Sequence, residues 1–325
     1  MDTGIACGGI GRAGWMRMST FGRITALSLD GSWMLHHNRL MKHRYLNQHN
    51  ALWLSIQMLV LWALASPPIA KPWYDSLLFK PWMTGGDPTI TSIAGVPKQN
   101  LTITTKSGAR LNAWYFRVAE AKKTLLVSQG NGGAMADRKL LIESFLPYHV
   151  SLLEYDYAGY GTSTGKTSLD QILQDGDSVY DYLVNDLKVD PKSIVVVGES
   201  IGSGVACHIA SHRGCNSVIL LSPFCSLMRL AKSKLPWLNL YPASWFPYVD
   251  IDNRTALKDF QNPVLILYGP QDLTIPPSEA IELSRLCHTC SLVEIPGRGH
   301  LLYYPPTSEY KSALITFLSG RQKCN

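Results

Sequence analysis

One serine of the chain stands in a setting typical of a nucleophile. Ser200 lies in Gly198-Glu-Ser-Ile-Gly202, a G-x-S-x-G pattern with an apolar run before it and an amphipathic stretch after it. A strand that turns sharply into a helix needs such glycines, and the turn lifts the serine hydroxyl above the sheet. The helix N-terminus also favours negative charge that develops beside it. The context therefore predicts a nucleophile rather than a chance pair of glycines in a loop.

A serine hydroxyl needs a base to become a nucleophile, and the base needs an acid to hold its tautomer. His300 follows the last apolar run of the chain, and Asp272 follows the run before it. We therefore predict a triad of Ser200, His300 and Asp272. Asp156 is the alternative acid, which we interpret as a residue that organises its loop. Four other histidines are interpreted as surface or packing residues: His149, His208, His212 and His288.

An attack by serine on a carbonyl creates an oxyanion, which backbone N–H groups can stabilise. The first predicted donor is the N–H of Ile201, directly after the nucleophile. The second is Asn131 in the glycine-rich segment 128–133, where main chain can approach a ligand closely. A phosphate-binding P-loop is excluded because no Lys-Ser/Thr follows these glycines.

The elements that must position these residues alternate along the chain. Apolar runs at 124–128, 150–155, 193–197, 217–221, 264–268 and 291–295 alternate with helical stretches near 136–147, 168–187, 201–213, 277–287 and 306–319. Such alternation is typical of a parallel sheet with helices on both faces. Residues 101–106 and 111–118 predict an antiparallel hairpin before it. The expected fold is α/β, with a mostly parallel sheet of about eight strands.

Residues 227–260 interrupt this alternation. Prolines within the segment argue against one long helix, and it carries the aromatic residues Trp237, Tyr241, Trp245, Phe246 and Tyr248. We predict a short lid inserted over the edge of the sheet. Trp245 and Phe246 are the predicted substrate contacts, because ligand pockets are mostly apolar. A packed cap is the alternative.

These ordered motifs resemble those of the α/β-hydrolase superfamily over roughly residues 75–320. Within it the chain is similar to small-lid serine hydrolases that include serine-aminopeptidase-like hydrolases and acyl-protein thioesterases. Gln129-Gly130-Asn131 corresponds to their H-G-N, with glutamine in place of histidine. Asp156-Tyr-Ala-Gly-Tyr-Gly-Thr-Ser-Thr-Gly165 and Ser222-Pro-Phe-Cys-Ser-Leu227 match two further motifs. The order Ser, Asp, His along the chain is also that of the superfamily.

The resemblance and the triad together imply a serine esterase or thioesterase that works through an acyl-enzyme on a small-molecule or acylated substrate. No cofactor and no metal are expected. An amidase or peptidase with the same triad is the first alternative. The second is a non-catalytic binding module on a hydrolase fold.

The N-terminal part of the chain has a different composition. Residues 1–65 hold six Lys and Arg against two Asp and Glu, and the remainder of the chain is nearly neutral, so no nucleic-acid partner is expected. A basic flank and the apolar run 51–65 predict a signal peptide or signal anchor over 41–65, with a buried core helix as the alternative. The protein would then be exported or membrane-anchored, with membrane association through residues 51–65. Residues 1–40 would be a non-folding extension, 66–99 a connecting segment and 100–325 the hydrolase domain.

The cysteines do not predict a metal site. Cys287-His-Thr-Cys290 is a C-x-x-C motif without a second pair at zinc-ligand spacing. In an exported protein these two thiols could form a disulfide, and separate packed thiols are the alternative. Cys207 is expected in the core.

Overall fold

The computed structural model describes residues 32–83 and 85–320, so the first 31 residues of the predicted N-terminal extension lie outside it. The chain divides into two compact units between Trp62 and Ala63. The described part of the first unit lies wholly within α1 (Ser32–Leu64), one continuous helix that begins before the basic flank and includes the apolar run as far as Leu64. No helix within the described ranges combines the length and the apolar character needed to cross a membrane. Export of the protein stays a prediction.

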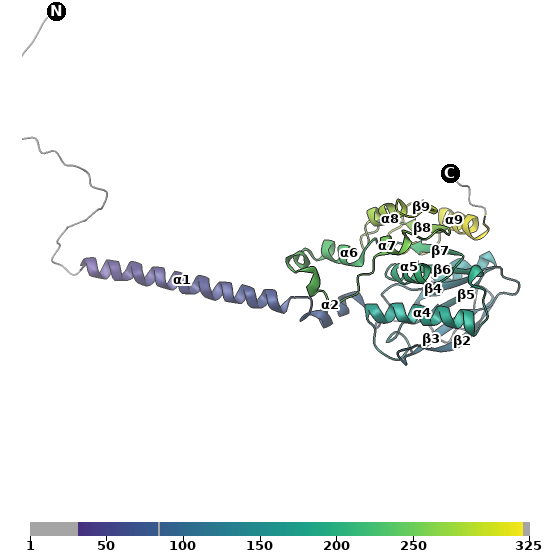
Figure 1. Cartoon of the computed structure of the whole chain (residues 1–325), viewed down its shortest axis with the longest axis horizontal. Coiled ribbons are helices and arrows are strands. Elements are labelled where there is room, and N and C mark those ends of the chain that lie inside the picture. Colours follow the sequence, from purple (N-terminus) through teal and green to yellow (C-terminus); the bar gives the residue numbers. More distant parts are fainter. Residues whose placement is uncertain (1–31, 84, 321–325) are drawn as a thin grey trace, which may run out of the picture. The chain divides into compact units, whose positions relative to one another are not determined.

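The second unit is built on a sheet of nine strands (Figure 1). Their order in the sheet is β1-β2-β3-β5-β4-β6-β7-β8-β9. β1 to β3 and the β3–β5 pair are antiparallel, and every other pair is parallel. The strands are β1 (Ser92–Ile93), β2 (Val96–Thr104), β3 (Arg110–Phe116), β4 (Thr124–Ser128), β5 (Ser151–Tyr155), β6 (Ile194–Glu199), β7 (Ser217–Leu221), β8 (Val264–Tyr268) and β9 (Cys290–Glu294).

The central strands are buried because helices cover both faces of the sheet. Alternate residues of β6 enter different cores: Ile194 and Val196 pack on one face, and Val195 and Val197 on the other. The first core includes buried residues of α4 (Leu169–Asn185), α5 (Gly202–His212) and α8 (Pro277–Ser284). The second includes residues of α3 (Lys139–Phe145) and α9 (Ser308–Leu318). This arrangement confirms the predicted fold class.

The segment 66–99, expected as a connection, contributes structure of its own. It contains α2 (Lys71–Leu78), the two residues of β1 and the start of β2. The sheet therefore begins before residue 100 and has one strand more than the expected eight. A two-residue strand carries too little pattern to be found from sequence, since alternation needs at least four residues to show.

The predicted lid lies between β7 and β8. Residues 227–260, all of them described, contain no strand, and they form α6 (Leu227–Lys234), α7 (Asn253–Leu257) and two short 3-10 turns at Pro236–Leu240 and Ala243–Trp245. Prolines begin or precede both turns, which explains why no long helix forms.

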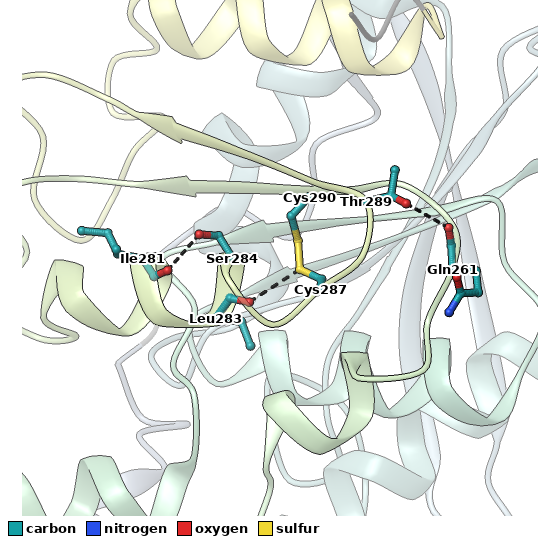
Figure 2. Close-up of a disulfide and its surroundings, with 7 residues drawn as sticks. All are labelled: Gln261, Ile281, Leu283, Ser284, Cys287, Thr289 and Cys290. Atoms are coloured by element: carbon teal, nitrogen blue, oxygen red, sulfur yellow. Dashed lines mark hydrogen bonds between the residues drawn. A yellow bond between two sulfur atoms is a disulfide. The ribbon is translucent and has the colours of Figure 1, made fainter. Parts of the chain in front are cut away.

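Cys287, in the turn after α8, and Cys290, the first residue of β9, form a disulfide (Figure 2). Their Cα atoms lie 5.7 Å apart, within the usual range for a disulfide. The sequence left this pairing open, and the structure decides it. Cys207, Cys215 and Cys225 are free and buried, and burial raises the pKa of each thiol. A thiol with a raised pKa is a poor nucleophile.

Candidate active site

Ser200 lies at the strained turn that its motif predicts. It sits between β6 and α5 with φ of +54°, a left-handed conformation that is costly for any residue except glycine. Its backbone N–H donates to Leu221 O at the end of β7 (2.9 Å). A Cβ at position 198 would lie 2.4 Å from Gly202 O, and a Cβ at position 202 would lie 2.1 Å from Ser128 O. Both glycines of the motif are therefore required by space.

Asp272 and His300 lie side by side, in the loops that follow β8 and β9. His300 Nδ1 lies 2.7 Å from Asp272 Oδ2. The other oxygen, Oδ1, accepts from the backbone N–H groups of Thr274 (2.8 Å) and Ile275 (2.9 Å). Burial by itself would raise the pKa of Asp272, but His300 and the two amides outweigh it and hold that pKa below its ordinary value. The carboxylate is therefore ionised, as a residue that orients a histidine must be.

The end of β7 brings His300 close to Ser200. Ser222 follows Leu221, the acceptor of the Ser200 amide, and its hydroxyl donates to His300 O (2.9 Å). Ser200 is thus hydrogen-bonded to Leu221 and His300 to Ser222, two successive residues at the end of β7. Ser200 is buried, with 7% of its surface exposed, and within the described ranges its hydroxyl makes no hydrogen bond. Such bonds often tighten only when substrate binds.

Hydrogen bonds hold Asn131, one of the two predicted oxyanion donors. The Asn131 side chain donates to Leu78 O (2.7 Å), and Asn131 O accepts from Lys80 N (3.0 Å) and from the Tyr160 hydroxyl (2.8 Å). The Asn131 side chain is therefore occupied, so the group that could bind an oxyanion is its backbone N–H. In the described part of the chain neither this N–H nor that of Ile201 donates to a protein acceptor.

Asp156 serves another part of the site. Its carboxylate accepts from Met135 N (2.6 Å) and from the Gln129 side chain (3.3 Å). This agrees with the interpretation of Asp156 as a loop-organising residue. Gln129, which replaces the histidine of the related motif, thus retains a structural hydrogen bond, and its backbone O accepts from the Tyr157 hydroxyl (2.8 Å).

A buried cluster of charges beneath the site was missed from the sequence. Arg138 Nη1 lies 3.3 Å from Glu199 Oε2, and Tyr303 donates to Glu199 Oε1 (3.0 Å). Glu154 on β5 is fully buried, and both its carboxyl oxygens lack a hydrogen-bond partner within the described chain. The charge at position 199, directly before the nucleophile, was the one available signal.

Glu154 is expected to make stability depend on pH. Burial raises its pKa well above the ordinary value, Arg138 opposes this rise, and Glu199 and Asp156 add to it. An acid with a raised folded-state pKa supplies stability below its unfolded pKa, and this stability is lost as pH rises. Glu154→Gln should therefore increase the free energy of unfolding by up to about 1.4 kcal/mol for each pH unit above about 4.5. Denaturant unfolding at pH 5 to 8 measures this difference, and a gain that does not grow with pH would contradict it.

An apolar cavity of about 360 Å³ opens beside the candidate site. Its walls include Asn131 and Thr274, whose amides belong to the oxyanion loop and to the Asp272 loop. Phe246 lines the cavity, whereas Trp245 is not among its lining residues and stacks on Tyr241 with ring centroids 6.2 Å apart. Other apolar walls come from α2 and the lid: Leu77, Leu78, Leu227, Leu230, Leu235 and Leu238.

Similarity to known proteins agrees with this fold. The family model of the serine aminopeptidases, S33, matches residues 119–258. An uncharacterized protein of Mycobacterium tuberculosis is 30% identical over 208 residues, which cover 62% of this chain and 72% of the relative. The α/β hydrolase domain-containing protein 17C of Mus musculus is 30% identical over 196 residues, 59% of this chain and 58% of the relative.

Solved structures show the same architecture. An esterase of Pyrococcus furiosus has a TM-score of 0.59 at 18% identity, covering 73% of this chain and 97% of its own. Est1E of Butyrivibrio proteoclasticus, solved with ferulic acid, has a TM-score of 0.56 at 22% identity, covering 68% and 98%. The chain belongs to the α/β-hydrolase superfamily, and hydrolysis is the class of reaction that these similarities support.

Proposed function

We propose that the protein is a serine hydrolase that cleaves a carboxylic ester or thioester through an acyl-enzyme. The observation that carries the proposal is the strained Ser200, whose backbone N–H is bonded to the end of β7, where Ser222 also holds the loop of the His300–Asp272 pair. Serine lacks the conformational freedom of glycine, so holding Ser200 at a positive φ strains the backbone. Such strain is typical of functional positions.

The proposed reaction uses three groups in turn. Ser200 Oγ attacks the carbonyl carbon while His300 Nε2 accepts the hydroxyl proton, and Asp272 stabilises the imidazolium through Nδ1. The N–H groups of Ile201 and Asn131 stabilise the oxyanion. His300 returns the proton to the departing alcohol or thiol, and a water molecule then releases the acid in the same way.

An amidase or peptidase is the second candidate, because the matching family model is that of serine aminopeptidases. The same triad would serve both reactions, since only the leaving group differs. Turnover of an ester and an amide with the same acyl group separates them. Amide turnover equal to that of the ester would favour the peptidase.

The cavity supports an apolar acyl group as the substrate. A volume of about 360 Å³ lies within the range of small-molecule pockets. Each buried methylene stabilises binding by about 0.8 kcal/mol, or roughly fourfold in affinity. We therefore propose that a medium-length acyl chain occupies the space between α2 and the lid.

Activity on p-nitrophenyl esters should accordingly rise with acyl length from acetyl to a medium chain. Phe246→Ala should flatten this rise, because it removes one wall of the cavity, whereas Trp245→Ala should retain it. The measurement is kcat/KM across the ester series for the wild type and both variants. A profile highest for acetyl, or equal flattening in both variants, would mean that these aromatic residues only pack the lid.

A further inference from the structure

Three separate loops of the site converge on one buried ion pair. Glu199 directly precedes Ser200, and its side chain is only 2% exposed; that of Arg138 is 11% exposed. Around the pair lie the oxyanion loop and Tyr303, which is three residues beyond His300. Within the described chain neither member of the pair hydrogen-bonds to Ser200 Oγ or to the His300 ring, so the pair has no direct role in the proposed reaction.

The pair holds both neighbours of Asn131. Gly130 N donates to Glu199 Oε2 (3.3 Å), and Arg138 Nη2 donates to Gly132 O (2.5 Å). A Cβ at position 130 would lie 3.3 Å from both Arg138 Nη2 and Glu199 Oε2, so the loop packs closely on the two charged groups. The backbone at Asn131 is thus fixed from both sides.

The same pair also holds the histidine loop. Tyr303 donates to Glu199 Oε1 (3.0 Å) and accepts from Arg138 Nη1 (3.2 Å). Burial raises the pKa of Tyr303, which keeps its hydroxyl protonated and able to donate. A buried ion pair of this kind favours one arrangement of the chain, because separating its partners would leave buried charge unpaired.

We propose that Arg138 and Glu199 are positioning residues, which place the Asn131 N–H for the oxyanion relative to Ser200 and His300. The inference rests on the proposed serine-hydrolase function. It predicts an effect on the transition state rather than on substrate binding, because an oxyanion donor acts only once the negative charge has formed.

Arg138→Met is expected to lower kcat about 10- to 100-fold with KM changed by less than about threefold, since a misplaced donor costs transition-state stabilisation alone. Affinity for a tetrahedral boronic-acid inhibitor should fall by the same factor as kcat/KM. Arg138→Lys should recover only part of the loss, because an ammonium lacks the fork that reaches both Glu199 and Gly132. Glu199→Gln, which retains shape and loses charge, should show a smaller loss with the same pattern.

Arg213→Met is the matched control. Arg213 pairs with Asp177 (3.3 Å) and Asp181 (3.2 Å), both on α4 and away from the site. It should leave kcat and inhibitor affinity unchanged. Circular dichroism and the melting temperature establish folding for each variant; if Arg138→Met does not fold, Glu199→Gln and Tyr303→Phe provide the test.

The outcomes separate the two proposals. Absence of fluorophosphonate labelling in the wild type would contradict the serine-hydrolase function itself. With labelling present, folded variants that keep kcat within about threefold would overturn the positioning role. So would a loss confined to KM, or a lower melting temperature without loss of boronic-acid affinity.

Discussion

Ser200→Ala is expected to abolish fluorophosphonate labelling and to lower kcat by roughly 10⁴- to 10⁶-fold, the effect of removing a nucleophile from a triad. The hydroxyl is the group that attacks, and no neighbouring side chain replaces it. The protein should remain folded, because the turn depends on Gly198, Gly202 and the bond from Ser200 N to Leu221 O, all of which alanine retains.

Labelling followed by peptide mapping measures this outcome, with circular dichroism as the test of folding. Ser211→Ala is the matched control, since Ser211 lies on α5 and its hydroxyl donates to His208 O (2.9 Å). It should retain full labelling. Persistent labelling of Ser200→Ala at another serine would show that the nucleophile is elsewhere.

His300→Ala should lower kcat by several orders of magnitude, because the serine then has no base. Asp272→Asn should lower kcat by roughly 10³- to 10⁴-fold, because the amide can support the wrong histidine tautomer. This loss should be smaller than that of Ser200→Ala or His300→Ala. Steady-state kinetics on one ester substrate measures all three.

Asp156→Asn provides the comparison for the acid. Its carboxylate holds Met135 N and the Gln129 side chain, so its removal should disturb the loop and cost less activity than Asp272→Asn. A folded Asp156→Asn variant with the greater loss would mean that the wrong acid has been assigned. The pKa of Asp272 also makes stability depend on pH, because it is lower in the folded protein than its unfolded value of 3.8. The ionised carboxylate therefore stabilises the fold above pH 3.8, and this stability is lost as the pH falls through the folded pKa.

Much of the site could be predicted because its residues lie where regular elements end. Ser200 and Asp272 each follow a buried parallel strand and His300 follows β9, the partly exposed parallel strand at the side of the sheet, and the carboxyl ends of such strands meet at one edge. Burial on both faces makes these strands continuous apolar runs, which are visible in sequence. The glycines of the elbow are equally visible, because no other residue fits the space.

The sequence located the lid but did not show which of its side chains line the cavity. Its aromatic residues lie in short turns broken by prolines, where no periodicity tells which side chain faces inward. Phe246 lines the cavity and Trp245 stacks on Tyr241, although the two are neighbours in sequence. The C-x-x-C pairing was open for a similar reason: spacing permits a disulfide, and only the positions of the two Cα atoms decide it.

The sequence by itself determined the α/β class, the positions of the main strands along the chain and the residues proposed to act on substrate, because these follow from local pattern and strand ends. Only the tertiary structure decided what supports them. Arg138, Glu199 and Tyr303 belong to three different segments, and Tyr303 is 104 residues from Glu199. A long-range ion pair leaves no periodic signal, since its partners come together only when the sheet and its loops have assembled.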